Sequence, residues 1–372
     1  MTRRARWAWG LGLGAAIALG ATFTVVHVTA NTSFDEAASA LDDAATDAAD
    51  VRDALSDASD AGADAASAGQ AIVDSAADDL VDIAARTALA GSVVATSEAV
   101  TAAEAARVER IARPDDKPLW TWELLAATPR MTAQTVALEA DVDAMRDAES
   151  ALVTAGEALT ESAGALYRSV APAAAALEAA NISARTAAVL DFRDAAAAAS
   201  AQTQVDSAAA VDFSSYAARA TVLKESAQAE LAEKAGRLLG TRLEIEAYAR
   251  SIAGGVVLDF DWAPTVAGTG GREGIGGTAT WNTGRGGFST ITLSHSVAEN
   301  WPSADARALV THEVGHAITS KCHEMFDSEN QPANEEWATA WAISMGHTAL
   351  GNGVYAYGYP SQAMIDVAAT CR

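Results

Sequence analysis

The sequence is poor in cysteine, proline and aromatic residues. Among 372 residues there are only 2 Cys and 8 Pro, and Phe, Trp and Tyr together make up 6%. Two Cys cannot form the disulfide framework of a small secreted domain. Because proline interrupts helices, its scarcity leaves long stretches in which helices can form.

Basic residues are also scarce. The chain has 25 Lys and Arg against 49 Asp and Glu, which gives a formal net charge of -24. Binding to nucleic acid depends on Lys and Arg that displace counterions from phosphates, so the composition argues against a nucleic-acid partner. Many of the acids lie between Phe34 and Ala112, which indicates a solvated, self-repelling rod rather than an acidic pocket.

The first 30 residues contain an uncharged run behind a cluster of arginines. Arg3, Arg4 and Arg6 precede a stretch without charge from Trp7 to Ala30. This pattern predicts either a signal peptide cleaved after Ala30 or an uncleaved anchor that spans a membrane. Both alternatives place the rest of the chain outside the cytoplasm. We therefore expect an extracellular or cell-surface protein, secreted or held by a single N-terminal transmembrane helix.

Residues 34–250 are rich in Ala, with Asp, Glu and Ser between scattered Leu and Val. This composition favours helix. The prolines of the region, Pro114, Pro118, Pro129 and Pro172, are expected to divide it into three helical stretches. We predict an all-α, Ala-rich helical bundle or coiled-coil stalk that acts as a spacer, self-associates or binds a partner. A partly disordered segment of low complexity is the alternative.

Apolar residues recur every seven positions in each stretch. The rows are Leu41, Ala48, Leu55, Gly62 and Gly69, with Ala44, Val51, Ala58, Ala65 and Ile72, in the first stretch; Leu138, Met145, Leu152, Leu159 and Leu166 in the second; and Leu231, Leu238 and Ile245 in the third. This spacing predicts narrow apolar seams along which the helices pack. Trp120 and Trp122, in the turn between helices, are expected to be buried as a cap on the bundle, with contact to a partner as the alternative.

The composition changes at Ser251, and residues 251–372 are expected to form a compact α+β domain. Residues 256–260 predict a buried strand, and residues 278–281 and 288–295 predict a hairpin. Residues 288–295 are expected to form an edge strand to which an extended peptide can add. A helix should follow from Ser303, which can cap its N-terminus, to about Ser320.

This helix contains the pattern His312-Glu313-Val314-Gly315-His316. Residues four apart lie on one face of a helix, so His312 and His316 can offer two imidazole nitrogens to one zinc ion. Glu313 lies beside them and can accept a proton from a metal-bound water. A catalytic zinc site needs a third protein ligand, for which Glu335 and Glu336 are the candidates. They lie in a second helical stretch that begins near Pro332.

The His-Glu-x-x-His pattern and the Asn334-Glu335 pair that follows it resemble the gluzincin metallopeptidases. The resemblance covers about residues 256–372 and implies a zincin-like α+β domain with a small sheet, an active helix and a glutamate helix. It makes Glu335 the third ligand to one Zn²⁺ and Glu313 the general base, with Glu336 as the alternative ligand. Thr339 departs from the family, because an acid usually stands there and holds a ligating His.

Two further features concern the end of the chain. Tyr355, Tyr357, Tyr359 and His347 are candidate donors to a transition-state oxyanion, although at least two of the tyrosines are expected to pack as an aromatic turn. In an exported chain, Cys322 and Cys371 are expected to form one disulfide that ties the C-terminus to the end of the active helix. Two unrelated thiols, or a metal role for Cys322 with His323, are the alternatives.

These features predict an exported or membrane-anchored zinc metallopeptidase that hydrolyses a peptide or protein substrate. The partners would be that substrate, the membrane if the first 30 residues are not cleaved, and further copies of the chain through the stalk. A catalytically silent zinc-binding interaction protein is one alternative, and Thr339 favours it. A hydrolase of cell-wall peptides is another. Glu313 favours an enzyme, because a structural zinc site needs no general base.

Overall fold

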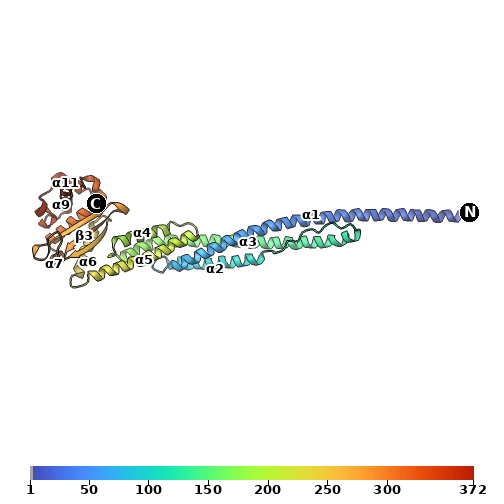
Figure 1. The fold of residues 1–372 in the computed structure, drawn as a ribbon, viewed down its shortest axis with the longest axis horizontal. Helices are drawn as coiled ribbons and strands as arrows, with labels where there is room; N and C mark the ends of the chain where they lie inside the picture. The colour runs from blue at the N-terminus through green and yellow to red at the C-terminus, as the bar shows by residue number, and fades with distance from the viewer. Residues whose placement is uncertain (1–2) are drawn as a thin grey trace. The chain divides into compact units, whose positions relative to one another are not determined.

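The computed structural model describes the backbone of residues 3–372 and the side chains of residues 23–372. The chain is mostly helical and carries a small three-stranded sheet (Figure 1). It divides into two compact units. The first comprises residues up to Ser75, Ile83–Tyr167 and Thr203–Ala210, and the second comprises Ala76–Asp82, Arg168–Gln202 and Val211–Arg372.

The predicted signal or anchor segment, residues 1–30, falls largely outside the side chains that the structure describes. Within residues 23–372, no helix combines the length and the apolar character needed to cross a membrane.

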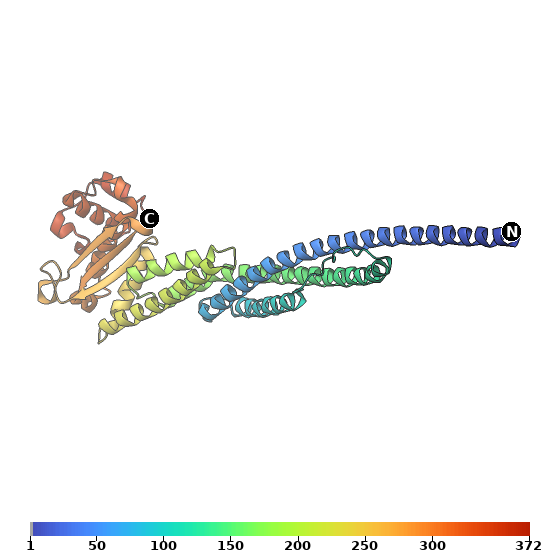
Figure 2. The same cartoon turned by 45° about the vertical axis from the view of Figure 1, so that its right-hand side comes forward.

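The first unit contains long helices packed along the predicted seams. They are α1 (Arg3–Ser75), α2 (Ile83–Ala106) and most of α3 (Thr121–Ala180), and Figures 1 and 2 both show α2 beside α1. Leu41 and Leu55 on α1 are buried in one cluster with Leu138 and Leu152 on α3. A Cβ atom at Gly62 would lie 3.0 Å from the Leu152 side chain, so a small residue is needed there for close helix packing. The predicted helical character is therefore confirmed in this part of the chain.

The predicted division by proline is wrong for two of the four prolines. Pro114 and Pro118 lie in the loop between α2 and α3, but α3 continues through Pro129 and Pro172. The seven-residue row continues from Leu138 through the buried Met131 to the buried Leu124, which lies upstream of Pro129. Burial of this seam on both sides of the proline offsets its cost of about 3 kcal/mol in a helix interior.

The predicted third seam is also wrong. The chain forms three shorter helices there, namely α4 (Thr186–Ser200), α5 (Ser207–Glu233) and α6 (Leu239–Ile252). Leu231 is exposed near the end of α5, and a turn at Gly236, with φ of 122°, precedes Leu238. Because the turn redirects the chain, Ile245 is buried in the C-terminal core instead of continuing a row with Leu231.

The sheet contains β1 (Val257–Ala263), β2 (Gly277–Asn282) and β3 (Phe288–Ser294) in the order β1-β3-β2. The hairpin of β2 and β3 is antiparallel as predicted, and β1 is parallel to β3. The expectation that residues 288–295 form an edge strand is wrong, because β3 lies at the centre of the sheet. The free edge on the hairpin side belongs to β2.

The remaining elements are short, apart from two helices that carry the candidate site. They are α7 (His295–Asn300), α8 (Ala304–Cys322), α9 (Gln331–Ser344), α10 (Val354–Tyr357) and α11 (Gln362–Ala368), with 3-10 turns at Gly271–Glu273, Gly284–Gly286, His323–Met325 and Leu350–Asn352.

One core joins the sheet to these helices. Phe260 and Leu293 from the sheet are buried together with Val314 on α8 and Trp341 on α9. Residues of α6 belong to the same core, so residues 239–250, assigned to the stalk in the sequence analysis, pack with the α+β part. Cys322 and Cys371 form the predicted disulfide, and the indole of Trp341 donates to the Cys371 carbonyl over 3.0 Å. The end of α8 is thereby tied to the C-terminus.

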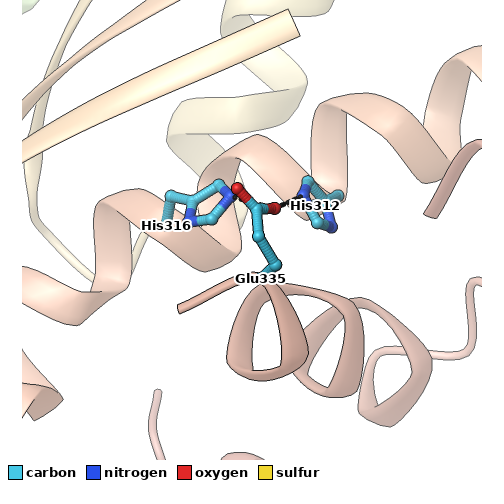
Figure 3. Close-up of side chains that lie close together, drawn as sticks. All are labelled: His312, His316 and Glu335. Atoms are coloured by element: carbon cyan, nitrogen blue, oxygen red, sulfur yellow. Dashed lines mark hydrogen bonds and ion pairs between the residues drawn. The ribbon is translucent and has the colours of Figure 1, made fainter. Parts of the chain in front are cut away.

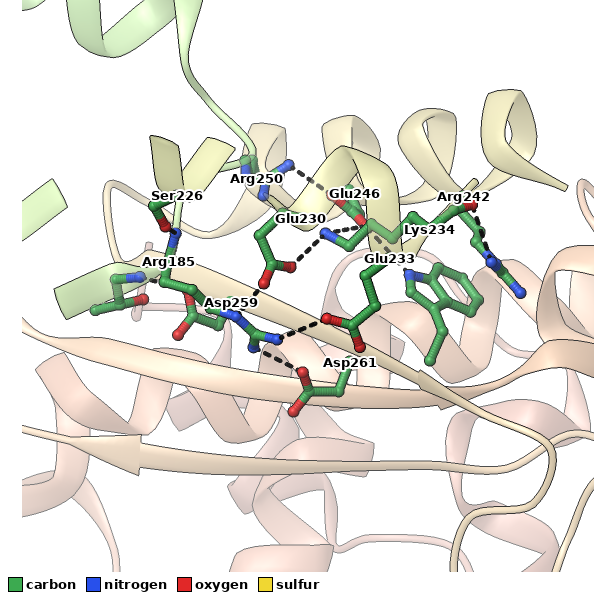
Figure 4. Close-up of polar contacts among 12 residues, drawn as sticks. Arg185, Ser226, Glu230, Glu233, Lys234, Arg242, Glu246, Arg250, Asp259 and Asp261 are labelled. Atoms are coloured by element: carbon green, nitrogen blue, oxygen red, sulfur yellow. Dashed lines mark hydrogen bonds and ion pairs between the residues drawn. The ribbon is translucent and has the colours of Figure 1, made fainter. Parts of the chain in front are cut away.

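A buried ionic network links α5, α6 and β1 within the second unit (Figure 4). The Lys234 ammonium lies 3.2 Å from a Glu230 oxygen and 3.0 Å from a Glu246 oxygen, and all three side chains are buried. Arg185, just before α4, pairs with Glu230 and, over 2.7 Å, with Asp261 on β1. Since each buried charge has a partner, the junction between the helices and the sheet depends on the whole set.

Replacement of Lys234 by methionine should therefore destabilise the second unit strongly. The substitution keeps most of the side-chain volume but leaves Glu230 and Glu246 buried without their shared cation, at a cost of about 3–5 kcal/mol. Calorimetric unfolding of the full chain measures the effect. Lys224→Met is the matched control, because Lys224 forms a half-exposed pair with Asp79 and should cost about 1 kcal/mol or less. Equal effects of the two substitutions would contradict this prediction.

Candidate metal site

The helix α8 begins where the sequence predicts and is buried throughout residues 310–320. The Ser303 hydroxyl accepts a hydrogen bond from the Ala306 amide over 3.2 Å, which caps the helix. His312, Glu313 and His316 are all buried. The motif therefore lies on a rigid helix within the core rather than on a loop.

The packing of α9 against α8 brings the predicted ligands together. The same Glu335 oxygen lies 3.3 Å from His312 Nε2 and 3.2 Å from His316 Nε2. Figure 3 shows the carboxylate between the two imidazoles, and the three potential ligand atoms lie within 4.8 Å of one another. His312, His316 and Glu335 can therefore hold a metal ion.

The alternative ligand, Glu336, is engaged elsewhere. Its carboxylate accepts hydrogen bonds from the Ser361 amide over 3.0 Å and the Ser361 hydroxyl over 3.1 Å. The two successive glutamates thus point to different sides of α9. Of the two candidates from the sequence, the geometry favours Glu335.

Close approach of the two helices depends on Gly315, between the two histidines. A Cβ atom at this position would lie 2.9 Å from both the Cα and the carbonyl oxygen of Ala338 on α9. The Trp337 indole donates to the Gly315 carbonyl over 3.1 Å. A side chain at position 315 would separate the helices and move Glu335 away from the histidines.

The orientation of His312 is set by a backbone carbonyl. Its Nδ1 lies 2.9 Å from the Asn352 carbonyl oxygen, whereas the Thr339 hydroxyl is 3.4 Å away. A carbonyl can only accept, so Nδ1 donates, and Nε2, which faces Glu335, is the nitrogen that a metal could bind. The role that the acid plays in gluzincins is thus available here without an acid at position 339.

Asn352 was missed by the sequence analysis, and its own side chain holds it in place. The side-chain nitrogen of Asn352 donates to the His347 carbonyl over 3.0 Å. Its side-chain oxygen accepts from the backbone N–H of Val354 over 3.0 Å. Gly353 follows with φ of 96°, and a Cβ there would lie 2.5 Å from the Thr339 hydroxyl. The Asn-Gly pair predicts a turn, but nothing in the sequence places that turn behind His312.

Glu313 carries a carboxylate oxygen without a partner. Among the described residues, its Oε2 is buried and makes no hydrogen bond. The pKa of Glu313 is raised to about 7, mainly by burial. The charge of His312 lowers this pKa, and the charge of Glu335 raises it. An unpaired buried carboxylate oxygen is costly unless another molecule bonds to it. A water at the site is the simplest such partner, and two imidazoles with one carboxylate form a donor set that suits zinc with an open position.

Gly277, the first residue of β2, lies directly against Glu313. A Cβ atom on Gly277 would be 2.6 Å from Glu313 Oε1. The strand with the free edge therefore begins beside the candidate base.

Opposing influences act on the pKa of Glu335. Burial raises it, but hydrogen bonds and charge interactions with His312 and His316 lower it further, so the net shift is downward. The carboxylate is therefore held ionised, as a metal ligand must be.

Of the four candidate oxyanion donors, Tyr357 lies at the site. Its ring stacks on His312 with centroids 6.0 Å apart and planes 9° from parallel. Burial, the charges of Glu335 and Glu313 and a hydrogen bond with Glu335 raise the pKa of Tyr357, which keeps the phenol protonated.

Among the described residues, no hydrogen bond or ring contact joins the other three candidates to the ligand set. Tyr355 and Tyr359 are 85% and 69% exposed, so the expected packing of an aromatic turn is wrong for both. His347 bonds instead to the Tyr248 hydroxyl over 2.9 Å. Cys322 is bound in the disulfide, which rules out its suggested metal role with His323.

Comparison with known proteins assigns neither a family nor a function. The sequence matches no family model, and no curated protein or solved structure is significantly similar to it. Function must be inferred from the geometry of the site.

Proposed function

We propose that the chain is an exported or membrane-anchored, zinc-dependent metallopeptidase of the gluzincin type, with a zincin-like catalytic part. The observation that carries this proposal is the unpartnered, buried carboxylate of Glu313 beside the ligand set of His312, His316 and Glu335. A purely structural metal site requires the three ligands but has no use for a buried carboxylate with a free oxygen.

Each residue of the site has a separate role in the proposed reaction. When bound, zinc would polarise a peptide carbonyl and make water a stronger nucleophile. Glu313 accepts the proton of the attacking water and delivers it to the leaving amine. The phenol of Tyr357 donates a hydrogen bond to the oxyanion as charge develops on it. The Asn352 carbonyl holds His312 in the tautomer that binds metal through Nε2.

The edge of β2 supplies a place for an extended peptide. Unpaired backbone groups along such an edge bind a peptide as an added strand. Thr278 and Thr280 on this strand are exposed, and Gly277 places the start of the strand against Glu313. A peptide bound along β2 would thereby run past the general base.

Thr339, the residue that favoured a silent zinc-binding protein, is also compatible with an active enzyme. Thr339 replaces the usual acid, but the Asn352 carbonyl lies closer to His312 Nδ1 than the Thr339 hydroxyl does. The substitution is therefore compatible with an active site, and the peptidase remains the better supported proposal.

Metal content and peptide hydrolysis by the purified full chain test the proposal. We expect about one zinc per chain, cleavage of casein, loss of cleavage with a chelator and recovery when zinc is returned. Bound zinc without hydrolysis of casein or of cell-wall peptides would instead support the silent binding protein. Cleavage of wall peptides alone would assign the site to wall hydrolysis. A chain that binds no zinc would contradict the proposal altogether.

Tyr357→Phe should lower kcat by about 10²-fold, because the hydrogen bond to the oxyanion is removed. Zinc content should be unchanged, because His312, His316 and Glu335 all remain. Tyr355→Phe and Tyr359→Phe are the matched controls, since both rings are exposed and should retain full activity. Measurement of kcat and KM for all three variants separates the roles. A loss confined to KM, or an equal loss in the controls, would contradict the assignment of Tyr357.

A further inference from the structure

An apolar surface is exposed in the first unit at the start of α3. Trp120 and Trp122 are 57% and 61% exposed and stack on one another with ring centroids 5.0 Å apart. The prediction that they cap the bundle by burial is therefore wrong. We call these two indoles the tryptophan patch, together with the exposed Leu119 and Leu125 beside them in the sequence and the exposed Phe23, which stacks on His27 of α1.

The patch includes residues from two segments that are far apart in the sequence. His27 Nδ1 on α1 lies 2.7 Å from the hydroxyl of Thr121, the residue between the two tryptophans. Both segments belong to the first unit. This contact places the two indoles at the level of residue 27 along α1.

Residue 27 is close to the end of the uncharged run in the sequence. The run extends from Trp7 to Ala30, and α1 is a single helix from Arg3. At 1.5 Å per residue, 24 helical residues span about 36 Å, compared with about 30 Å for the hydrocarbon layer of a bilayer. If the run is inserted in a membrane, residue 27 lies close to the outer boundary of the lipid, and so do the tryptophans.

The charges near the patch suit this position. The long acidic part of α1 would be repelled by an anionic surface, but Lys117 pairs with Asp35 over 2.7 Å and Arg113 pairs with Asp42 over 3.1 Å. Residues 107–130 contain one more basic than acidic residue, in a chain with a net charge of -24. Two acids in the part of α1 near the patch, Asp35 and Asp42, are thus paired with basic residues of the loop that precedes the patch.

We propose that the tryptophan patch contacts the interfacial layer of the lipid bilayer in which residues 7–30 are anchored. Indole rings favour the boundary between hydrocarbon and water, because they combine a large apolar surface with one N–H donor. The patch fixes the depth and tilt at which the helical unit leaves the membrane. This inference rests on the uncleaved anchor and is independent of the peptidase proposal.

Fluorescence of the full chain in phosphatidylcholine vesicles tests the inference. The difference in emission between the wild type and the Trp120→Phe, Trp122→Phe double variant isolates the two indoles. Lipid with bromine on the upper acyl chain should quench about half of this emission, because the quencher acts only at short range from the interface. Trp281→Phe is the matched control, since Trp281 stacks on His323 in the second unit and its emission should be insensitive to brominated lipid.

Three results would overturn the proposal. The first is difference emission that brominated lipid leaves unchanged and that aqueous iodide quenches. The second is a dimer in detergent that the double variant dissociates, which would assign the patch to a second copy of the chain. The third is a mature chain that begins at Asn31 and leaves the membrane fraction, because no bilayer would then lie beside the patch.

Discussion

Glu313→Gln should abolish peptide hydrolysis while leaving the metal bound. Glutamine has nearly the shape of glutamate but cannot accept the proton of the attacking water, so kcat should fall by about 10³-fold or more. His312, His316 and Glu335 are unchanged, and zinc content should remain about one per chain. The measurement is kcat on a peptide substrate, with zinc determined on the same sample.

Each result has a different meaning for the role of Glu313. Loss of hydrolysis with zinc retained identifies Glu313 as the base. Unchanged hydrolysis would remove Glu313 from the mechanism and with it the main support for a gluzincin-type enzyme. Loss of zinc together with hydrolysis would show that the substitution disturbs the ligands, and Glu313→Asp, which keeps the charge, would then have to show metal binding with weak activity.

The same substitution should change the pH dependence of stability in the chelator-treated protein. The pKa of Glu313 is raised by burial from 4.5 to about 7, so the folded chain binds this proton more tightly than the unfolded chain. The resulting stabilisation is fully present below about pH 4.5 and is lost as the pH rises through 7, by a total on the order of 3 kcal/mol. Glu313→Gln should remove this decline.

Denaturant unfolding of both proteins between pH 5 and about 8 measures the difference. The lowered pKa of Glu335 does not affect stability in this pH range. Its pKa is lowered by folding, so its stabilising contribution is present above its unfolded pKa and disappears only at more acidic pH. Parallel stability curves for the wild type and the variant would contradict the assignment of a raised pKa to Glu313.

Gly315→Ala should weaken metal binding although position 315 is not itself a ligand. The new Cβ would lie 2.9 Å from backbone atoms of Ala338, which cannot yield as a flexible side chain can. The helices α8 and α9 must then separate, which costs about 1–3 kcal/mol in stability. Displacement of Glu335 from the histidines should lower zinc affinity by about 10²-fold, as measured by competition with a chromophoric chelator.

Gly156→Ala provides the control. Gly156 also lies inside a long helix, α3, but beyond the backbone of its own helix turn no described atom lies within 4 Å of the Cβ that alanine would add. Since alanine favours helix over glycine by about 1 kcal/mol, this variant should be as stable as the wild type or more so. If Gly315→Ala also kept full stability and zinc affinity, close approach at Gly315 would not be what positions Glu335.

The sequence was sufficient to identify the parts that depend on local spacing. His312 and His316 share a face because a helix repeats about every four residues, and Ser303 caps that helix by a contact three residues away. Leu138 to Leu166 line a seam because their seven-residue spacing keeps them on one side of α3. The pairing of two cysteines also required little more than their number.

The tertiary structure decided whatever depends on which segments meet. Glu335 and Glu336 are adjacent residues of the same type. The packing of α9 on α8 directs Glu335 to the histidines and Glu336 to Ser361. Pro129 was expected to end a helix, but burial of the seam on both sides outweighs its local cost. The central position of β3, the exposure of the two tryptophans and the Asn352 carbonyl behind His312 likewise arise from contacts between segments distant in the chain. The energy of such contacts depends on the partner surface, which local spacing does not specify.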